Sequence, residues 1–141
     1  MSGVLVDTNV VSELMLPLAE RSVTEWLNAM EPSELFLAST SLAELRFGIA
    51  VLPAGRRKSK LGGALDYVLD SLFAGRILAF DAVAAERYAE ITSRAQRMGR
   101  RIEIADGQIA AVAAMRGITV VTHDVGPFEV AGVAVVNPWV D

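Results

Sequence analysis

The sequence predicts an α/β fold in which helices flank a mainly parallel central sheet of about five strands. Five short apolar runs indicate the strands: Val4–Val6, Leu35–Ala38, Ile77–Phe80, Ile118–Val121 and Val133–Val136. They are too uniformly apolar for half-exposed strands, and strands buried on both faces are typical of parallel sheets. Helical patterns alternate with these runs, so right-handed crossovers are expected. The order of the strands stays open.

Five helices are predicted between the strands, from apolar residues spaced by three and four positions. They span Glu20–Met30, Leu42–Leu52, Leu61–Phe73, Ala82–Met98 and Asp106–Arg116. Asp81 is a candidate N-cap for the fourth helix, and Gly117 follows the last one where a left-handed C-terminal residue is favoured. Leu52-Pro53-Ala54-Gly55 is interpreted as a helix–helix turn. We therefore predict a single domain over residues 1–141.

The composition favours a globular protein without cysteine chemistry or a membrane span. Of the 141 residues, 52% are hydrophobic and 21% are charged, which favours a buried core over disorder. There is no cysteine, so disulfides, thiolate nucleophiles and cysteine-type zinc sites are excluded. The first residues lack the features of a signal peptide, and the longest apolar stretch, Ile104–Val121, contains Asp106 and Arg116. The expectation is a soluble, cytoplasmic protein without membrane contact.

The net charge of −4 argues against a strongly basic nucleic-acid binder, because phosphate contacts come mainly from Lys and Arg. The positive charge is nevertheless clustered. One cluster is Arg56, Arg57, Lys58 and Lys60, and the other is Arg94, Arg97, Arg100 and Arg101. Solvated helix ends are the simpler interpretation of both clusters, and contact with nucleic acid stays open.

Four acids are predicted to meet at one edge of the sheet. Asp7 directly follows the first strand, and Asp124 follows the fourth. Glu44 lies in the first turn of the helix after the second strand, and Asp106 opens the helix before the fourth. In open α/β sheets, ligands bind beyond the carboxyl ends of the strands.

Each acid also has a purely structural interpretation. Asp7 could cap a short helix, and Asp124 could be a turn residue. Ser41-x-x-Glu44 matches a capping box, in which Glu44 would accept from the amide of Ser41. Asp106 could be an N-cap or a first-turn acid that the helix dipole stabilises. The conjunction of four acids favours the functional interpretation.

Carboxylates brought together repel one another unless cations or protons neutralise them. Ligand sets made only of oxygen select hard ions such as Mg²⁺ or Mn²⁺. His123 is the only histidine, so a multi-histidine zinc centre is excluded. A bound divalent ion can activate water and neutralise charge on a phosphate, so the site suits phosphodiester hydrolysis.

The ordered motifs resemble PIN-domain toxins of the VapC family, in the FitB-like branch, over nearly the whole chain. The resemblance lies in Val4–Leu14, Ser41–Ile49, Phe73–Leu78 with Phe80-Asp81, Ile104–Ala111, Val121–Asp124, Gly132-Val133 and Val136–Trp139. It implies a three-layer α/β/α PIN-like domain that hydrolyses RNA with Mg²⁺ or Mn²⁺. It also implies a homodimer, and a cognate antitoxin that forms a heterotetramer or larger complex and alone contacts operator DNA.

The resemblance places the catalytic and metal-binding acids on Asp7, Glu44, Asp106 and Asp124. It implies supporting roles for Thr8, Asn9 and Thr122, as groups that orient metal ligands commonly have. His123 stands where the family often has an arginine, which leaves a phosphate contact at that position in doubt. Asp81 is treated as structural.

Two rival functions remain open. A phosphoryl-transfer domain could use Asp7 as phosphoacceptor, but such domains require a late lysine, and the last lysine is Lys60. A catalytically silent partner of an antitoxin could act only in operator-DNA binding. Helices Val23–Met30 and Leu61–Phe73 could carry a dimer face or an antitoxin groove, or simply pack in the core.

Overall fold

The computed structural model describes residues 3–140, so residues 1, 2 and 141 of the predicted domain lie outside the described part. Five strands form one sheet: β1 (Val4–Val6), β2 (Leu35–Ala38), β3 (Ile77–Leu78), β4 (Thr119–Val121) and β5 (Val135–Val136). All four strand pairs are parallel, in the order β3-β2-β1-β4-β5. The predicted fold class is confirmed, and every strand lies within a predicted run.

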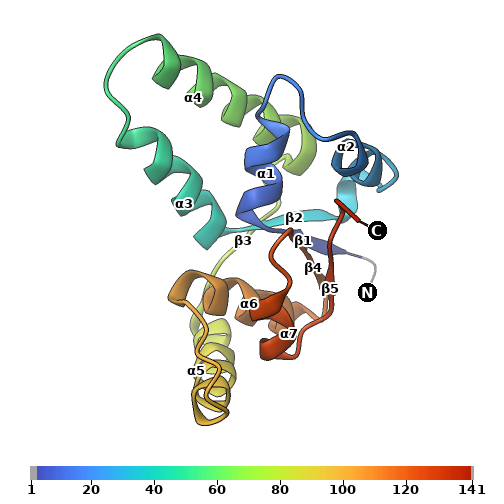
Figure 1. Ribbon diagram of the computed structural model, residues 1–141, viewed down its shortest axis with the longest axis vertical. Helices are drawn as coiled ribbons and strands as arrows, with labels where there is room; N and C mark the ends of the chain where they lie inside the picture. Colours follow the sequence, from blue (N-terminus) through green and yellow to red (C-terminus); the bar gives the residue numbers. More distant parts are fainter. Residues whose placement is uncertain (1–2, 141) are drawn as a thin grey trace.

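The helices form a layer on each side of the sheet, with α1–α4 on one side and α5–α7 on the other (Figure 1). Their bounds are α1 Thr8–Leu14, α2 Arg21–Asn28, α3 Ser39–Ala50, α4 Arg56–Val68, α5 Ala82–Arg97, α6 Ile104–Arg116 and α7 Gly126–Ala131, with a 3₁₀ turn η1 at Pro32–Glu34 and a π-helical turn η2 at Leu69–Phe73. Helices α1 and α7 were not predicted, since seven and six residues are too short for a periodic pattern.

Two apolar cores explain why the strands are apolar throughout. Val4 and Val6 point into the core beneath α1–α4, whereas Leu5 between them points into the core beneath α5–α7. This alternation is the two-residue period of a strand, and here both faces are covered. No helix within residues 3–140 is long and apolar enough to cross a membrane.

The strand order places a topological switch point at the centre of the sheet. From β1 the chain proceeds outward through β2 and β3, and then returns to the other side of β1 for β4 and β5. The register pairs Val6 with Leu37 and with Val121, so these carboxyl ends are level. A crevice beyond the carboxyl ends of β1 and β4 is where this topology places a ligand.

Local predictions at the helix ends have mixed outcomes. Asp81 caps α5 by accepting from the amide of Ala84 at 3.0 Å, and Gly117 ends α6 in the left-handed conformation, as predicted. The capping box of Ser41 and Glu44 is wrong, because α3 begins at Ser39 and its N-cap residue is Ala38. An N-cap role for Asp106 is also wrong, since Glu103 is the N-cap residue and Asp106 lies in the first turn.

Candidate metal-binding active site

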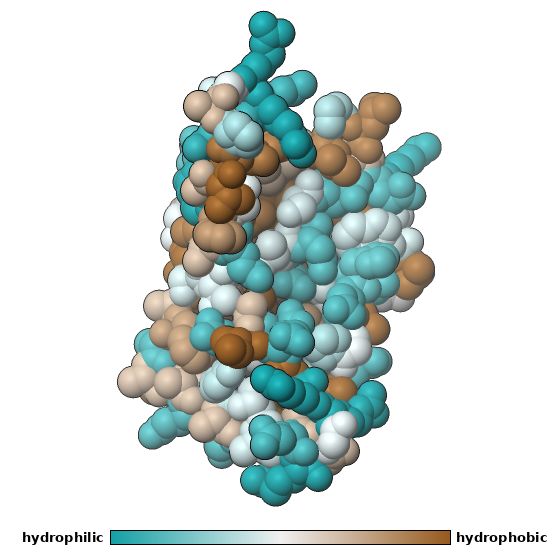
Figure 2. All heavy atoms as spheres, turned by 60° about the vertical axis from the view of Figure 1, so that its left-hand side comes forward, coloured by the Kyte–Doolittle hydropathy of each residue, from teal (hydrophilic) through white to brown (hydrophobic). Residues whose placement is uncertain are grey.

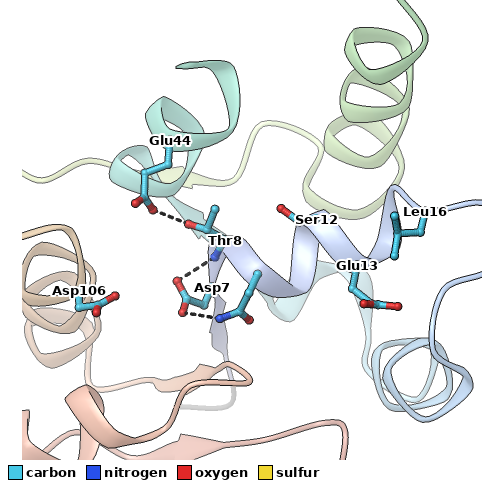
Figure 3. Close-up of a pocket in the computed structure, with 8 residues that line it drawn as sticks. Asp7, Thr8, Ser12, Glu13, Leu16, Glu44 and Asp106 are labelled. Atoms are coloured by element: carbon cyan, nitrogen blue, oxygen red, sulfur yellow. Dashed lines mark hydrogen bonds between the residues drawn. The ribbon is translucent and has the colours of Figure 1, made fainter. Parts of the chain in front are cut away.

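Asp7 is the buried centre of the site, with only 4% of its surface exposed. Its backbone extends β1, because its amide donates to the carbonyl of Val121 at 2.9 Å. Its side chain caps α1, since Oδ1 accepts from the amide of Thr8 at 2.8 Å. The N-cap interpretation of Asp7 is therefore correct, and it leaves one carboxylate edge directed at the cavity (Figure 3).

A hydrogen-bond network holds the second oxygen of Asp7. The hydroxyl of Thr122, fully buried after β4, donates to Oδ2 at 2.7 Å and accepts from Nδ2 of Asn9 at 3.1 Å. The same hydroxyl accepts from the amide of Asp124 at 3.1 Å, and Oδ1 of Asn9 accepts from the amide of His123 at 3.1 Å. Thr122 and Asn9 thus tie the loop after β4 to Asp7.

Glu44 lies on α3, the helix that follows β2, and β2 is the strand next to β1. Its Oε1 accepts from the hydroxyl of Thr8 at 2.6 Å (Figure 3). Thr8 follows Asp7 directly, so one dipeptide fixes the positions of two acids. Glu44 therefore joins the site through Thr8 rather than through a capping box with Ser41.

Asp106 faces Asp7 across the cavity from the first turn of α6 (Figure 3). Burial, and then the charges of Asp7, Asp124 and Glu44, raise the pKa of Asp106 to about 6. Burial also raises the pKa of Asp7, against the lowering effect of the bonds from Thr122 and Thr8, and the charges of Glu44 and Asp124 raise it further. The charges of neighbouring acids therefore raise the pKa of both Asp7 and Asp106, and a bound cation would relieve this repulsion.

Three of the four predicted acids, Asp7, Glu44 and Asp106, line one cavity of about 510 Å³. The cavity is lined by Asp7, Thr8, Asn9, Ser12, Glu13, Leu16, Glu44 and Asp106. Asp124 is exposed on its loop and lies outside this lining. Ser12, Glu13 and Leu16 were missed, because they reach the cavity only through α1, whose helical spacing the sequence did not reveal.

A second, apolar groove of about 320 Å³ adjoins the first cavity between α1, α3 and α4. The two share Thr8, Ser12, Leu16 and Glu44, and the groove continues over Leu45, Ile49, Leu52 and Leu61 with Arg57 at its margin. A surface that joins an acidic cavity to an apolar groove can accept a chain with both charged and apolar groups.

The residues present fit a hard divalent ion that keeps part of its water. Within residues 3–140 no three acidic or histidine side chains are close enough together to form a complete metal cage. Mg²⁺ is commonly held by one or two carboxylates, with water and substrate phosphate completing its octahedron. Asp7 and Asp106, which face each other, match that requirement, and both carry raised pKa values.

His123 takes no place in the cavity lining. Its ring packs edge-to-face on Trp139, with 4.7 Å between the ring centroids. Its backbone amide, not its imidazole, contributes to the network through Asn9. The expectation that this lone histidine is a rim or structural residue agrees with these contacts.

Comparison with known proteins agrees with the fold. Residues 4–133 match the model of the PIN domain. The chain is 44% identical to Toxin FitB of Neisseria gonorrhoeae, covering 98% of this chain and 99% of that protein. It is 41% identical to VapC ribonuclease Y4jK of Sinorhizobium fredii, covering 96% and 97%. A solved structure of FitAB bound to an IR36 DNA fragment superposes with a TM-score of 0.88 at 43% identity, covering 96% and 95%. The chain belongs to the PIN-domain family, in the branch of the VapC and FitB toxins.

Proposed function

We propose that this protein is a divalent-metal-dependent endoribonuclease and the toxin of a type II toxin–antitoxin module of the cytoplasm. The observation that carries the proposal is the pair Asp7 and Asp106, which face each other at the switch point of the sheet with raised pKa values. Strongly perturbed carboxyls in a cleft are typical of functional sites. A relative 41% identical over nearly its full length is named a VapC ribonuclease.

In this proposal Asp7 and Asp106 bind Mg²⁺ or Mn²⁺, and Glu44 and Asp124 complete its surroundings directly or through water. When bound, the ion lowers the pKa of a water molecule and neutralises charge on the scissile phosphate and the leaving oxygen. Thr122 and Asn9 orient the carboxylate of Asp7, because both donate to its Oδ2. Thr8 orients the carboxylate of Glu44 by donating to its Oε1.

Metal removal tests the proposal directly. The purified, antitoxin-free protein is expected to cut a mixed RNA substrate with Mg²⁺ or Mn²⁺ and to lose the activity in EDTA, measured by gel analysis of RNA ends. Excess Mn²⁺ should restore cleavage. Cleavage that persists unchanged in EDTA would contradict the metal-dependent mechanism, and no cleavage under any condition would favour the silent antitoxin partner. A phosphoryl-transfer domain is not supported, because no lysine lines the cavity in the described part of the chain.

The proposed partners are a cognate antitoxin, which alone contacts operator DNA, and a second copy of the chain. The similar FitAB structure is bound to a DNA fragment. The large apolar groups of Val23–Met30 and Leu61–Phe73 mainly face the core, so core packing explains most of them. Exposed apolar groups lie instead on the helical hairpin of α3 and α4, here called the α3–α4 arm, at Phe47, Val51 and Tyr67. Apolar residues are also exposed in the upper part of Figure 2. This arm is the better candidate for a dimer face.

We further expect the segment between α5 and α6 to contact the RNA backbone. Arg97, Arg100 and Arg101 are exposed and form no ion pair within residues 3–140, and this end of the molecule is mainly hydrophilic (Figure 2). The segment leads directly into the turn that carries Asp106. Guanidinium groups there can hold phosphates beside the acidic cavity.

A double substitution, Arg100→Gln with Arg101→Gln, is expected to weaken RNA binding. If each arginine neutralises one phosphate, the slope of log K against log salt should become shallower by about 1.4, at about 0.7 per phosphate of single-stranded nucleic acid. Arg21→Gln is the matched control, since Arg21 is an exposed arginine paired with Glu25 on α2. Fluorescence anisotropy with a fluorescent RNA measures the slope, and equal slopes for all variants would contradict this contact.

A further inference from the structure

The C-terminal residues 137–139 lie against the outer side of the loop that follows β4. The rings of Trp139 and His123 meet edge-to-face, with centroids 4.7 Å apart and planes at 72°. Nδ2 of Asn137 donates to the carbonyl of His123 at 3.4 Å. This loop, Thr122-His123-Asp124, therefore contacts the C-terminal segment through the ring and the carbonyl of His123.

The C-terminal segment is itself anchored. The amide of Trp139 donates to Oδ1 of Asn137 at 2.9 Å, and its carbonyl accepts from the hydroxyl of Ser22 on α2 at 3.4 Å. The Trp139 side chain is partly buried against the core beneath α1–α4. Trp139 can therefore transmit the rigidity of that core to His123.

The loop is also held by hydrogen bonds to site residues and by the amide of Thr122, which donates to the carbonyl of Val136 at 2.9 Å. The amide of His123 donates to Asn9, and the amide of Asp124 donates to the hydroxyl of Thr122. The carboxylate of Asp124 is exposed, and its charge raises the pKa of both Asp7 and Asp106. His123 lies between Thr122 and Asp124 in the chain, so its ring contact with Trp139 limits the movement of both neighbours.

We propose that Trp139 is a positioning residue: by clamping His123, it holds Thr122 and Asp124 at their places beside Asp7. The role in catalysis rests on the proposed nuclease function, whereas the clamp itself does not. His123 acts here as an aromatic ring. Phe at position 123 should therefore preserve the clamp, whereas Ala should release it.

Amide hydrogen exchange in the metal-free protein tests the clamp without reference to activity. In Trp139→Ala, exchange at the amides of His123 and Asp124 is expected to accelerate about threefold to tenfold, the loss that one edge-to-face aromatic pair represents. Val120 and Val121 in β4 should keep their protection. Because His123 is exposed, His123→Ala tests the same contact without opening the core, and it should reproduce the effect.

Conservative variants and kinetics complete the experiment. Trp139→Phe and His123→Phe should restore slow exchange at Asp124, and His123→Ala should add little to Trp139→Ala. On RNA, Trp139→Ala is expected to lower kcat about tenfold with KM nearly unchanged, as for other groups that orient metal ligands. Unchanged exchange at both amides, or acceleration spread equally over β4 and α1, would overturn the clamp. If exchange accelerates in Trp139→Ala but the wild-type protein cleaves no RNA, the clamp is upheld and the nuclease function is refuted.

Discussion

Asp7→Asn is expected to reduce RNA cleavage by at least about 100-fold while the protein stays folded, because a metal ligand matters more than the outer groups that orient it. Asn keeps Oδ1, which accepts from the amide of Thr8 and caps α1. It removes the negative charge and replaces Oδ2 with an NH₂ group, which cannot bind a hard cation. Single-turnover cleavage and thermal unfolding should be measured on the same preparation.

Asp81→Asn is the matched control for Asp7→Asn. Asp81 also follows a strand and caps a helix, through the amide of Ala84, but it lies outside the acidic cavity. Asn is as good an N-cap as Asp, so both activity and stability should stay near the wild-type values. Wild-type cleavage by Asp7→Asn would show that Asp7 is not a metal ligand, whereas equal losses in both variants would point to a structural effect.

Asp106→Asn should abolish cleavage and yet stabilise the metal-free protein at neutral pH. The folded-state pKa of Asp106 is about 6 and its ordinary value is 3.8, so the folded state binds more protons between these values. Stability from this group is complete below about pH 4 and is lost as pH rises through 6. For a half-buried acid, after allowance for solvent screening, the loss is about 1 kcal/mol, or roughly 3 °C in Tm.

The measurement is the difference in Tm between Asp106→Asn and wild type across pH 4–8 in EDTA. The difference should be near zero at pH 4 and reach its full value above pH 6. Saturating Mn²⁺ should reverse the order, because an ion that binds only the folded wild type raises its Tm by mass action. A Tm difference that does not vary with pH would show that Asp106 is not coupled to the other acids.

The sequence predicted the strands beside the site better than the rest. Val4–Val6 and Leu35–Ala38 have the observed bounds, because strands buried on both faces are apolar runs with clear ends. The strand order β3-β2-β1-β4-β5 could not be predicted from the sequence, since it depends on long-range pairing that no local pattern encodes. The carboxyl-end rule still brought Asp7, Glu44 and Asp106 to one edge, because that rule does not depend on strand order.

Short helices and their ends were the weak points. In α1 the buried residues are Val10 and Val11, which are adjacent and so do not show the three- to four-residue spacing that predicts a helix. The capping-box pattern of Ser41 and Glu44 failed, because Thr8, distant in sequence, supplies the partner of Glu44. The cavity lining by Ser12 and Leu16 was missed for the same reason, since tertiary contacts decide which side of α1 faces the acids.

The central position of β1 delays closure of the sheet until late in the synthesis of the chain. Val4 pairs with Thr119, so the middle of the sheet closes only after most of the chain has left the ribosome. The site draws on β1, α3, α6 and the segment after β4, so a fragment that ends before Asp124 lacks at least one of the four acids. A nascent chain therefore acquires its full set of acids only late in its synthesis.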